Sequence, residues 1–125
     1  MELVQIAQHA DDLERAANFY ERLLGEKPTA TFDPPGLVFF RIGPTRLLLD
    51  RVAPSALLYI GVEDVRTRTD ELAAEGVTID TPPHVIFTHE DDRLGPAGHE
   101  EWQAFVEDTE GNTVGLIGFV RPASG

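Results

Sequence analysis

The chain has 125 residues, a formal net charge of -12 and no cysteine. A chain of this length is expected to form one domain with a proper core, and without cysteine it has no disulfide, thiolate metal site or cysteine nucleophile. The acidic charge argues against nucleic acid and an anionic membrane surface as partners. The first residues lack a basic region and the longest apolar stretches are strand-sized, so we expect no signal peptide, no membrane span and a cytoplasmic location.

The first half of the chain predicts one strand, one helix and three further strands. Apolar residues recur at helical spacing over residues 13–24, after the capping residue Asp12 and before Gly25, which suits a helix C-cap. The expected strands of this half are residues 3–9, 27–32, 37–42 and 46–51.

The same order begins again near residue 56. Asp64 is placed to cap a second helix, residues 65–75, which ends before Gly76. The expected extended segments are residues 56–62, 77–80, 84–89, 102–107 and 113–120, with a polar loop at 90–100. The two capping aspartates lie 52 residues apart, which indicates a repeat of one supersecondary unit.

The predicted fold class is therefore α+β, with two tandem βαβββ modules in a single domain spanning residues 1–125. The modules cover about residues 1–53 and 54–121. We expect eight strands in a cupped, mostly antiparallel mixed sheet, with the helices on its outer face. Neither half has enough sheet to close a core alone, so the halves should pair within one chain or across a dimer.

Two segments carry a resemblance to a known family. Asp-Leu-Glu-Arg-Ala at residues 12–16, followed by Phe19-Tyr20 and Leu24-Gly25, is similar to the first-helix signature of the glyoxalase/bleomycin resistance/dioxygenase superfamily, the vicinal oxygen chelate fold. Residues 105–112 resemble its closing hairpin, with Thr109 where proline is commoner. The run at residues 83–86, with Trp102 further on, resembles glyoxalase-like members without an assigned reaction. The resemblance implies the fold and a homodimer, since members commonly form two-fold dimers, but it spans lyases, epimerases, dioxygenases, transferases and binding proteins.

The resemblance also implies where metal-dependent members hold their ion. The four corresponding positions here are Gln5, Leu48, Leu57 and Gly115, with one residue of register left open at Leu48. We expect these positions to converge in one cavity. Three of them offer no side-chain donor, and one neutral amide cannot replace a set of carboxylates or imidazoles. No metal and no cofactor are therefore expected.

The leading hypothesis is a protein that binds an apolar or aromatic small molecule in the cup, for sequestration or resistance. The residues expected to bind this ligand are Gln5, Leu48, Leu57, Tyr59, His84, Trp102 and Gly115. The alternative is a lyase, isomerase or epimerase that uses a shifted site around Gln5 and His84, with His84 as the candidate catalytic residue. A structural or interaction module, for which the sequence offers only sheet edges that favour dimers, is the third alternative. A cup closed by its own side chains is the structural alternative to a ligand pocket.

Histidines near the polar loop at residues 90–100 are candidates for a replacement metal site. His84 and His89 are five residues apart, which places them on opposite faces of a strand unless a bulge intervenes. His89, His99, Glu100 and Glu101 could gather around an ion, but no diagnostic ligand spacing is present. The pattern favours a solvated polar loop.

Overall fold

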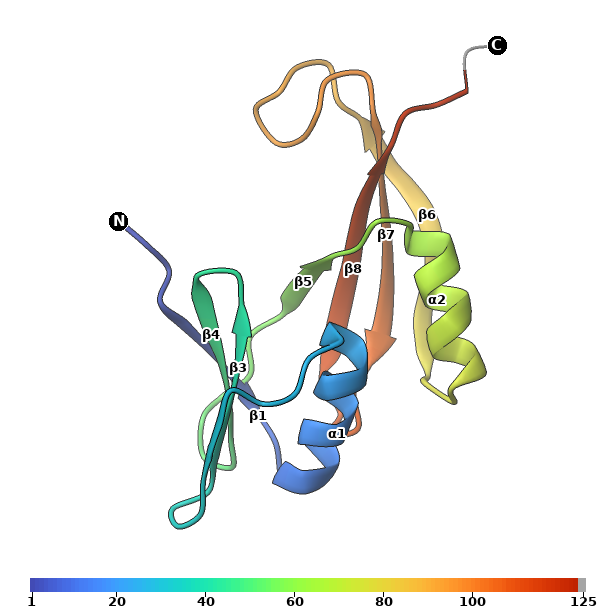
Figure 1. The fold of residues 1–125 in the computed structure, drawn as a ribbon. Helices are drawn as coiled ribbons and strands as arrows, with labels where there is room; N and C mark the ends of the chain where they lie inside the picture. The colour runs from blue at the N-terminus through green and yellow to red at the C-terminus, as the bar shows by residue number, and fades with distance from the viewer. Residues whose placement is uncertain (124–125) are drawn as a thin grey trace. The chain divides into compact units, whose positions relative to one another are not determined.

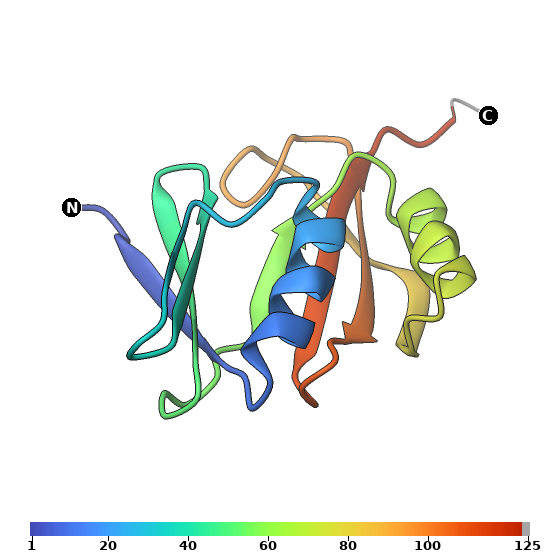
Figure 2. The same ribbon diagram turned by 60° about the horizontal axis from the view of Figure 1, so that its bottom comes forward.

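The structure, a computed structural model, describes residues 1–123 and divides into two compact units. The first unit comprises residues Met1–Ala56 together with the short segment Asp108–Asn112. The second comprises Leu57–Glu107 and the chain from Thr113 onward. Each half of the chain has the same succession of strand, helix and three strands. Figure 1 labels these elements except for β2, and Figure 2 shows the same ribbon from another side.

The first unit is built on a four-stranded sheet in the order β1-β4-β3-β2. Its elements are β1 (Gln5–His9), α1 (Leu13–Leu24), β2 (Ala30–Phe32), β3 (Leu37–Ile42) and β4 (Thr45–Asp50). The pair β1–β4 is parallel, and the other two pairs are antiparallel.

The second unit repeats this arrangement in the order β5-β8-β7-β6. Its elements are β5 (Leu58–Gly61), α2 (Val65–Ala74), β6 (Ile79–Thr88), β7 (Glu100–Glu107) and β8 (Thr113–Val120). Only β5–β8 is parallel among its strand pairs in the described chain. The predicted α+β class with two tandem βαβββ modules is confirmed, but strand pairing yields two four-stranded sheets in place of one eight-stranded ladder.

Both helices begin where the sequence predicts. The Asp12 carboxylate accepts a hydrogen bond from the Arg15 amide at 3.0 Å, and Gly25 ends α1 in the left-handed conformation at φ 75°. Asp64 accepts in the same way from the Thr67 amide at 3.2 Å. Neither helix within residues 1–123 is long and apolar enough to cross a membrane.

The main local difference from the prediction concerns β6. Two short extended segments were expected, whereas the structure has one strand that runs through Pro82 and Pro83. Proline cannot donate to a strand ladder, so it is tolerated at a sheet edge, and β6 is an edge strand with three register shifts against β7. One shift lies between Val85 and Phe87, so the simple alternation of side chains fails there.

Each sheet buries one face. In the first unit, α1 contacts β3 and β4, and the buried strand residues on that face are Gln8, Val38, Phe40, Leu47 and Leu49. In the second unit, α2 lies against β6, β7 and β8, as Figure 2 shows for β6. The buried strand residues there are Leu58, Ala104, Val106, Val114 and Leu116. The opposite face of each sheet is more open.

The turn between β7 and β8 belongs to the first unit through a buried network around Asp108. Its carboxylate accepts hydrogen bonds from the Tyr20 hydroxyl at 2.7 Å, the Glu110 and Asn112 amides at 2.8 Å each, and the Asn112 side chain at 2.7 Å. Gln8 donates to the Tyr20 hydroxyl at 3.2 Å. Burial first, and then the Asp108 charge, raises the pKa of Tyr20 far above its ordinary value. The tyrosine is therefore a fixed neutral donor.

Glu110, in the same turn, binds two residues at the start of α1. Its carboxylate accepts from Arg15 Nε at 2.8 Å, Arg15 Nη2 at 3.2 Å and the Asp12 amide at 2.9 Å. Burial acts to raise the pKa of Glu110, but the hydrogen bonds from Arg15, Asp12 and Thr109 outweigh it and lower the pKa to about 2. The carboxylate is thus stabilised in its charged form.

This depressed pKa predicts an acid-dependent loss of stability. A carboxylate whose folded pKa lies below its ordinary value of 4.5 stabilises the fold above that value and loses this contribution as the pH falls toward 2. We expect Glu110→Gln to lower the free energy of unfolding by about 1 kcal/mol at neutral pH, because Arg15 is half exposed and solvent screens the pair. Urea unfolding at a series of pH values measures this. If the difference in the free energy of unfolding between wild type and variant stays constant from neutral pH down to about pH 2, the lowered pKa of Glu110 is contradicted.

Candidate functional site

The open face of the second sheet carries two aromatic rings around a glycine. Tyr59 on β5 pairs with Gly115 on β8, which pairs with Phe105 on β7. The Tyr59 and Phe105 rings lie edge to face with their centroids 5.8 Å apart, and Tyr59 is 49% exposed. A Cβ at Gly115 would lie 2.8 Å from the Tyr59 ring and 3.1 Å from the Phe105 ring. We call Tyr59, Phe105 and Gly115 the aromatic shelf.

A row of polar side chains continues along this face on β7 and the end of β6. The Gln103 side chain donates to Glu101 Oε2 at 2.7 Å, and His89 Nε2 lies 2.9 Å from Glu101 Oε1. His89 is 4% exposed and Glu101 is 6% exposed. Burying a charged carboxylate is costly unless it accepts hydrogen bonds, and His89 and Gln103 supply them to Glu101.

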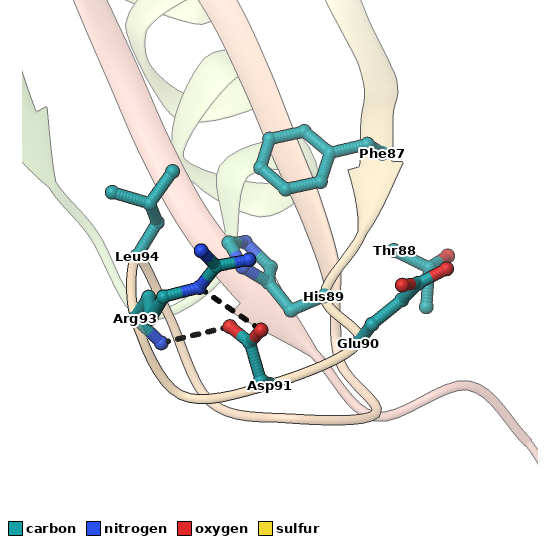
Figure 3. A pocket seen from close by; sticks show the side chains of 7 residues that line it. All are labelled: Phe87, Thr88, His89, Glu90, Asp91, Arg93 and Leu94. Carbon is teal, nitrogen blue, oxygen red and sulfur yellow. Dashed lines mark hydrogen bonds and ion pairs between the residues drawn. The ribbon is translucent and has the colours of Figure 1, made fainter.

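The loop after His89 forms a cavity of about 540 Å³ with the end of β6. Figure 3 shows its lining, with Phe87 on one side, Arg93 and Leu94 on the other, and the His89 ring between them. The Phe87 and His89 ring centroids are 4.3 Å apart. Arg93 is bound to Asp91 through its amide at 3.1 Å and its Nε at 3.0 Å.

This arrangement corrects the expectation of a solvated loop for His89 and Glu101. Both side chains are buried because Phe87 and Phe119 flank the imidazole, and Gly95 of the loop lies directly against it. These contacts join residues from three separate segments, so the local sequence pattern could not reveal them. No group of three metal-binding side chains occurs among the described residues, including those near His89.

The positions that hold the metal in metal-dependent members do not suit an ion here. In the first unit Gln5 is exposed, and Leu48 pairs with Ala7 and Phe39. In the second unit the shelf rings occupy the space that a side chain at Gly115 would need, and Leu57 is aliphatic. Leucine and glycine side chains offer no donor atom, so the usual set of carboxylates and imidazoles is missing.

Strand register shows that Leu48 and Gly115 hold equivalent places. Ala7 on β1 pairs with Leu48 on β4, and Tyr59 on β5 pairs with Gly115 on β8. Ala7 and Tyr59 stand at the same distance before the capping residues of their helices. The two modules therefore place a leucine in one sheet and a glycine in the other at the same structural position.

His84 and Trp102 lie in different surroundings. His84 pairs with Gln103, is exposed, and holds its Nδ1 3.0 Å from the Pro82 carbonyl oxygen. Trp102 lies on the opposite face of β7, with Arg66 of α2 4.4 Å from the centre of its ring. Trp102 therefore does not share the surface of Tyr59 and Gly115, because side chains alternate along a strand and Phe105 fixes which face is open.

In the first unit, the open face groups Gln5, Ala7, Phe39, Arg46 and Leu48. Arg46 pairs with Gln5 across the parallel ladder, and its guanidinium lies 5.6 Å from the centre of the Phe39 ring. This face offers the Gln5 amide and the guanidinium groups of Arg46 and its cross-strand partner Arg41, beside apolar side chains. Arg46 and Phe39 were not among the predicted site residues.

Several residues of the open face of the second sheet were not among the predicted ligand-binding residues. They are Phe87, His89, Glu101, Gln103, Phe105 and Phe119. Period-two alternation in phase with Tyr59 and Gly115 could have selected Gln103 and Phe105. The β6 bulge hides the phase of Phe87 and His89.

Comparisons with known proteins agree with this geometry. The model of the Glyoxalase/Bleomycin resistance protein/Dioxygenase superfamily matches residues 2–116, and the chain belongs to this superfamily. A comparison with curated proteins found no match.

Solved structures with the same fold include proteins of different kinds. An antibiotic binding protein, TnmS3 from a Streptomyces species, is 21% identical, with 93% of each chain covered and a TM-score of 0.69. A lactoylglutathione lyase from Agrobacterium tumefaciens is 21% identical, with 94% of this chain and 92% of that chain covered and a TM-score of 0.64. A virulence protein from Salmonella typhimurium is 18% identical, with 96% and 98% covered and a TM-score of 0.70. At these identities the likeness shows the fold alone.

Proposed function

We propose that this protein binds a small aromatic molecule on the aromatic shelf, without a metal, in a sequestration or resistance role. The observation that carries the proposal is the half-exposed Tyr59 ring, held against Phe105 above a buried glycine whose missing side chain leaves room for both rings. Aromatic side chains with an open face bind flat apolar ligands through area burial and ring geometry. The similarity in fold to an antibiotic binding protein is compatible with this role.

The enzymatic alternative, a lyase, isomerase or epimerase around Gln5 and His84, has weaker support. Gln5 and His84 are both exposed, and His84 Nδ1 already faces the Pro82 carbonyl. An exposed imidazole without an orienting carboxylate is a poor general base. We therefore keep small-molecule binding as the proposal. We propose further that the protein is a homodimer and that it is located in the cytoplasm.

Replacing Tyr59 tests the proposal. We expect wild type to bind 2-methoxynaphthalene and Tyr59→Ala to bind it roughly tenfold more weakly, since a ring pair and its buried area contribute about 1 kcal/mol or more. Titration calorimetry measures the affinity, and native mass spectrometry of the freshly purified protein reads any retained ligand and the mass of the assembly.

Val85→Ala is the matched control, because Val85 is 40% exposed yet pairs with Trp102 on the other face. Equal loss of affinity in both variants would sink the proposal, as would an absence of binding to wild type. A native mass of 13.8 kDa would exclude the homodimer.

A further inference from the structure

The pairing of His89 with Glu101 fixes which imidazole nitrogen carries the proton. A carboxylate accepts hydrogen bonds and donates none, so His89 Nε2, 2.9 Å from Glu101 Oε1, bears the hydrogen. Gln103 occupies the other carboxylate oxygen at 2.7 Å and prevents it from turning away. In the neutral ring, Nδ1 is then a hydrogen-bond acceptor.

This acceptor belongs to a side chain that lines the cavity formed by the loop. Within residues 1–123, His89 Nδ1 has no hydrogen-bond partner. In that part of the chain, two side-chain atoms are fully enclosed and have no hydrogen-bond partner, Gln8 Oε1 and Trp102 Nε1, and His89 Nδ1 is not one of them. Nδ1 is therefore not fully enclosed, and His89 lines the cavity shown in Figure 3.

The remaining walls define what would complement this acceptor. Phe87 and Leu94 are apolar and exposed, and Phe87 lies against the imidazole. The Arg93 guanidinium is held by Asp91, so its charge is already balanced. Thr88 and the carboxylate of Glu90 also line the cavity and can accept hydrogen bonds, and the cavity has no unbalanced cation. Such a site suits an uncharged planar molecule that carries a hydroxyl donor.

We propose that the cavity at His89 binds a hydroxylated aromatic molecule, whose O–H donates to His89 Nδ1 while its ring packs against Phe87 and Leu94. This site is separate from the aromatic shelf and goes beyond the function proposed for it. Glu101 and Gln103 act as positioning residues, because they fix the acceptor tautomer without touching the ligand.

A purely structural role for His89 is the competing explanation, since the loop folds over its ring. The base of the loop, however, is closed by backbone hydrogen bonds from the His89 amide to the His99 carbonyl at 2.9 Å and from the Gly98 amide to the His89 carbonyl at 2.8 Å. These bonds do not depend on the imidazole. A substitution that preserves the Glu101 contact can therefore separate the two roles.

His89→Gln is that substitution. The glutamine amide can place an N–H where Nε2–H stood, toward Glu101, but it has no acceptor at the position of Nδ1. We expect wild type to bind 2-naphthol about tenfold more tightly than its methyl ether at this cavity, because the ether cannot donate and one hydrogen bond is lost. In His89→Gln the two probes should bind equally.

Amide chemical shifts of the whole protein measure both affinities by site, with residues 87–94 reporting the cavity and residues 58–61 reporting the shelf. A long-range nitrogen–proton spectrum should show His89 protonated at Nε2 alone. Equal affinity of both probes for wild type at residues 87–94, an absence of shifts there, a proton on Nδ1 in the neutral ring, or preserved discrimination in His89→Gln would each overturn the proposal. Shifts confined to residues 58–61 would leave the shelf function intact while this inference fails.

Discussion

Replacing Asp108 with alanine is expected to lower the free energy of unfolding by about 3 kcal/mol or more, because the change strands several buried donors at once. The Tyr20 hydroxyl, two backbone amides and the Asn112 side chain all donate to this carboxylate. Each buried donor left without a partner costs about 1–3 kcal/mol, although the turn can relax toward water and recover part of this. Urea-induced unfolding followed by circular dichroism measures the change.

Tyr20→Phe provides the control for Asp108. It removes one of the four donors and keeps the aromatic packing of Tyr20 against Phe19 and Phe40, whose ring centroids lie 5.1 Å and 6.4 Å away. We expect a loss of about 1 kcal/mol, well below that of the aspartate variant. A similar loss in both variants would mean that the hydroxyl carries the network and that the turn amides contribute little.

Gly118 is the second position where a small change should have a large effect. It lies on β8 against the segment that connects β5 to α2, and a Cβ there would meet the Val62 carbonyl oxygen at 2.9 Å and Val65 Cγ2 at 3.0 Å. Backbone cannot move aside as a side chain does, so overpacking of this kind costs about 1–3 kcal/mol. We expect Gly118→Ala to lower the thermal midpoint accordingly, measured by calorimetry.

Gly61→Ala is the matched control for this substitution. Gly61 also lies in a strand of the second sheet, but nothing stands within 4 Å of the Cβ that alanine would add. Its replacement should be neutral or slightly stabilising, since alanine restricts the unfolded chain more than glycine does. Equal destabilisation by both alanines would refute a specific close approach at Gly118 and point to a general cost of altering these strands.

The helices and the repeat could be predicted because their signals are local. Asp12 and Asp64 each precede an apolar periodicity, and a cap is satisfied within three residues along the chain. The observed helix α1 spans the predicted residues, and α2 ends one residue earlier than predicted. Short-range chemistry of this kind does not depend on the rest of the molecule.

The candidate site was less predictable because it depends on contacts between distant segments. Trp102 lies on the α2 side of β7 because Phe105, three residues further along, pairs with Gly115 on the open face. His89 is enclosed by Phe119, thirty residues further along the chain. The closing-hairpin motif at residues 105–112 marks a structural turn, since Asp108 and Asn112 serve to hold that turn to the first unit.

The membership of residues 108–112 in the first unit also bears on how the protein is made. The Arg15–Glu110 ion pair joins residues that are 95 positions apart in the chain. A ribosome adding about 5–20 residues per second needs roughly 5–20 s to cover that span. During this interval the amino-terminal half emerges without the turn that completes it, so its final packing must await the synthesis of residues 108–112. Contacts between residues so far apart in the sequence slow folding, and the first unit can complete its fold only late in synthesis.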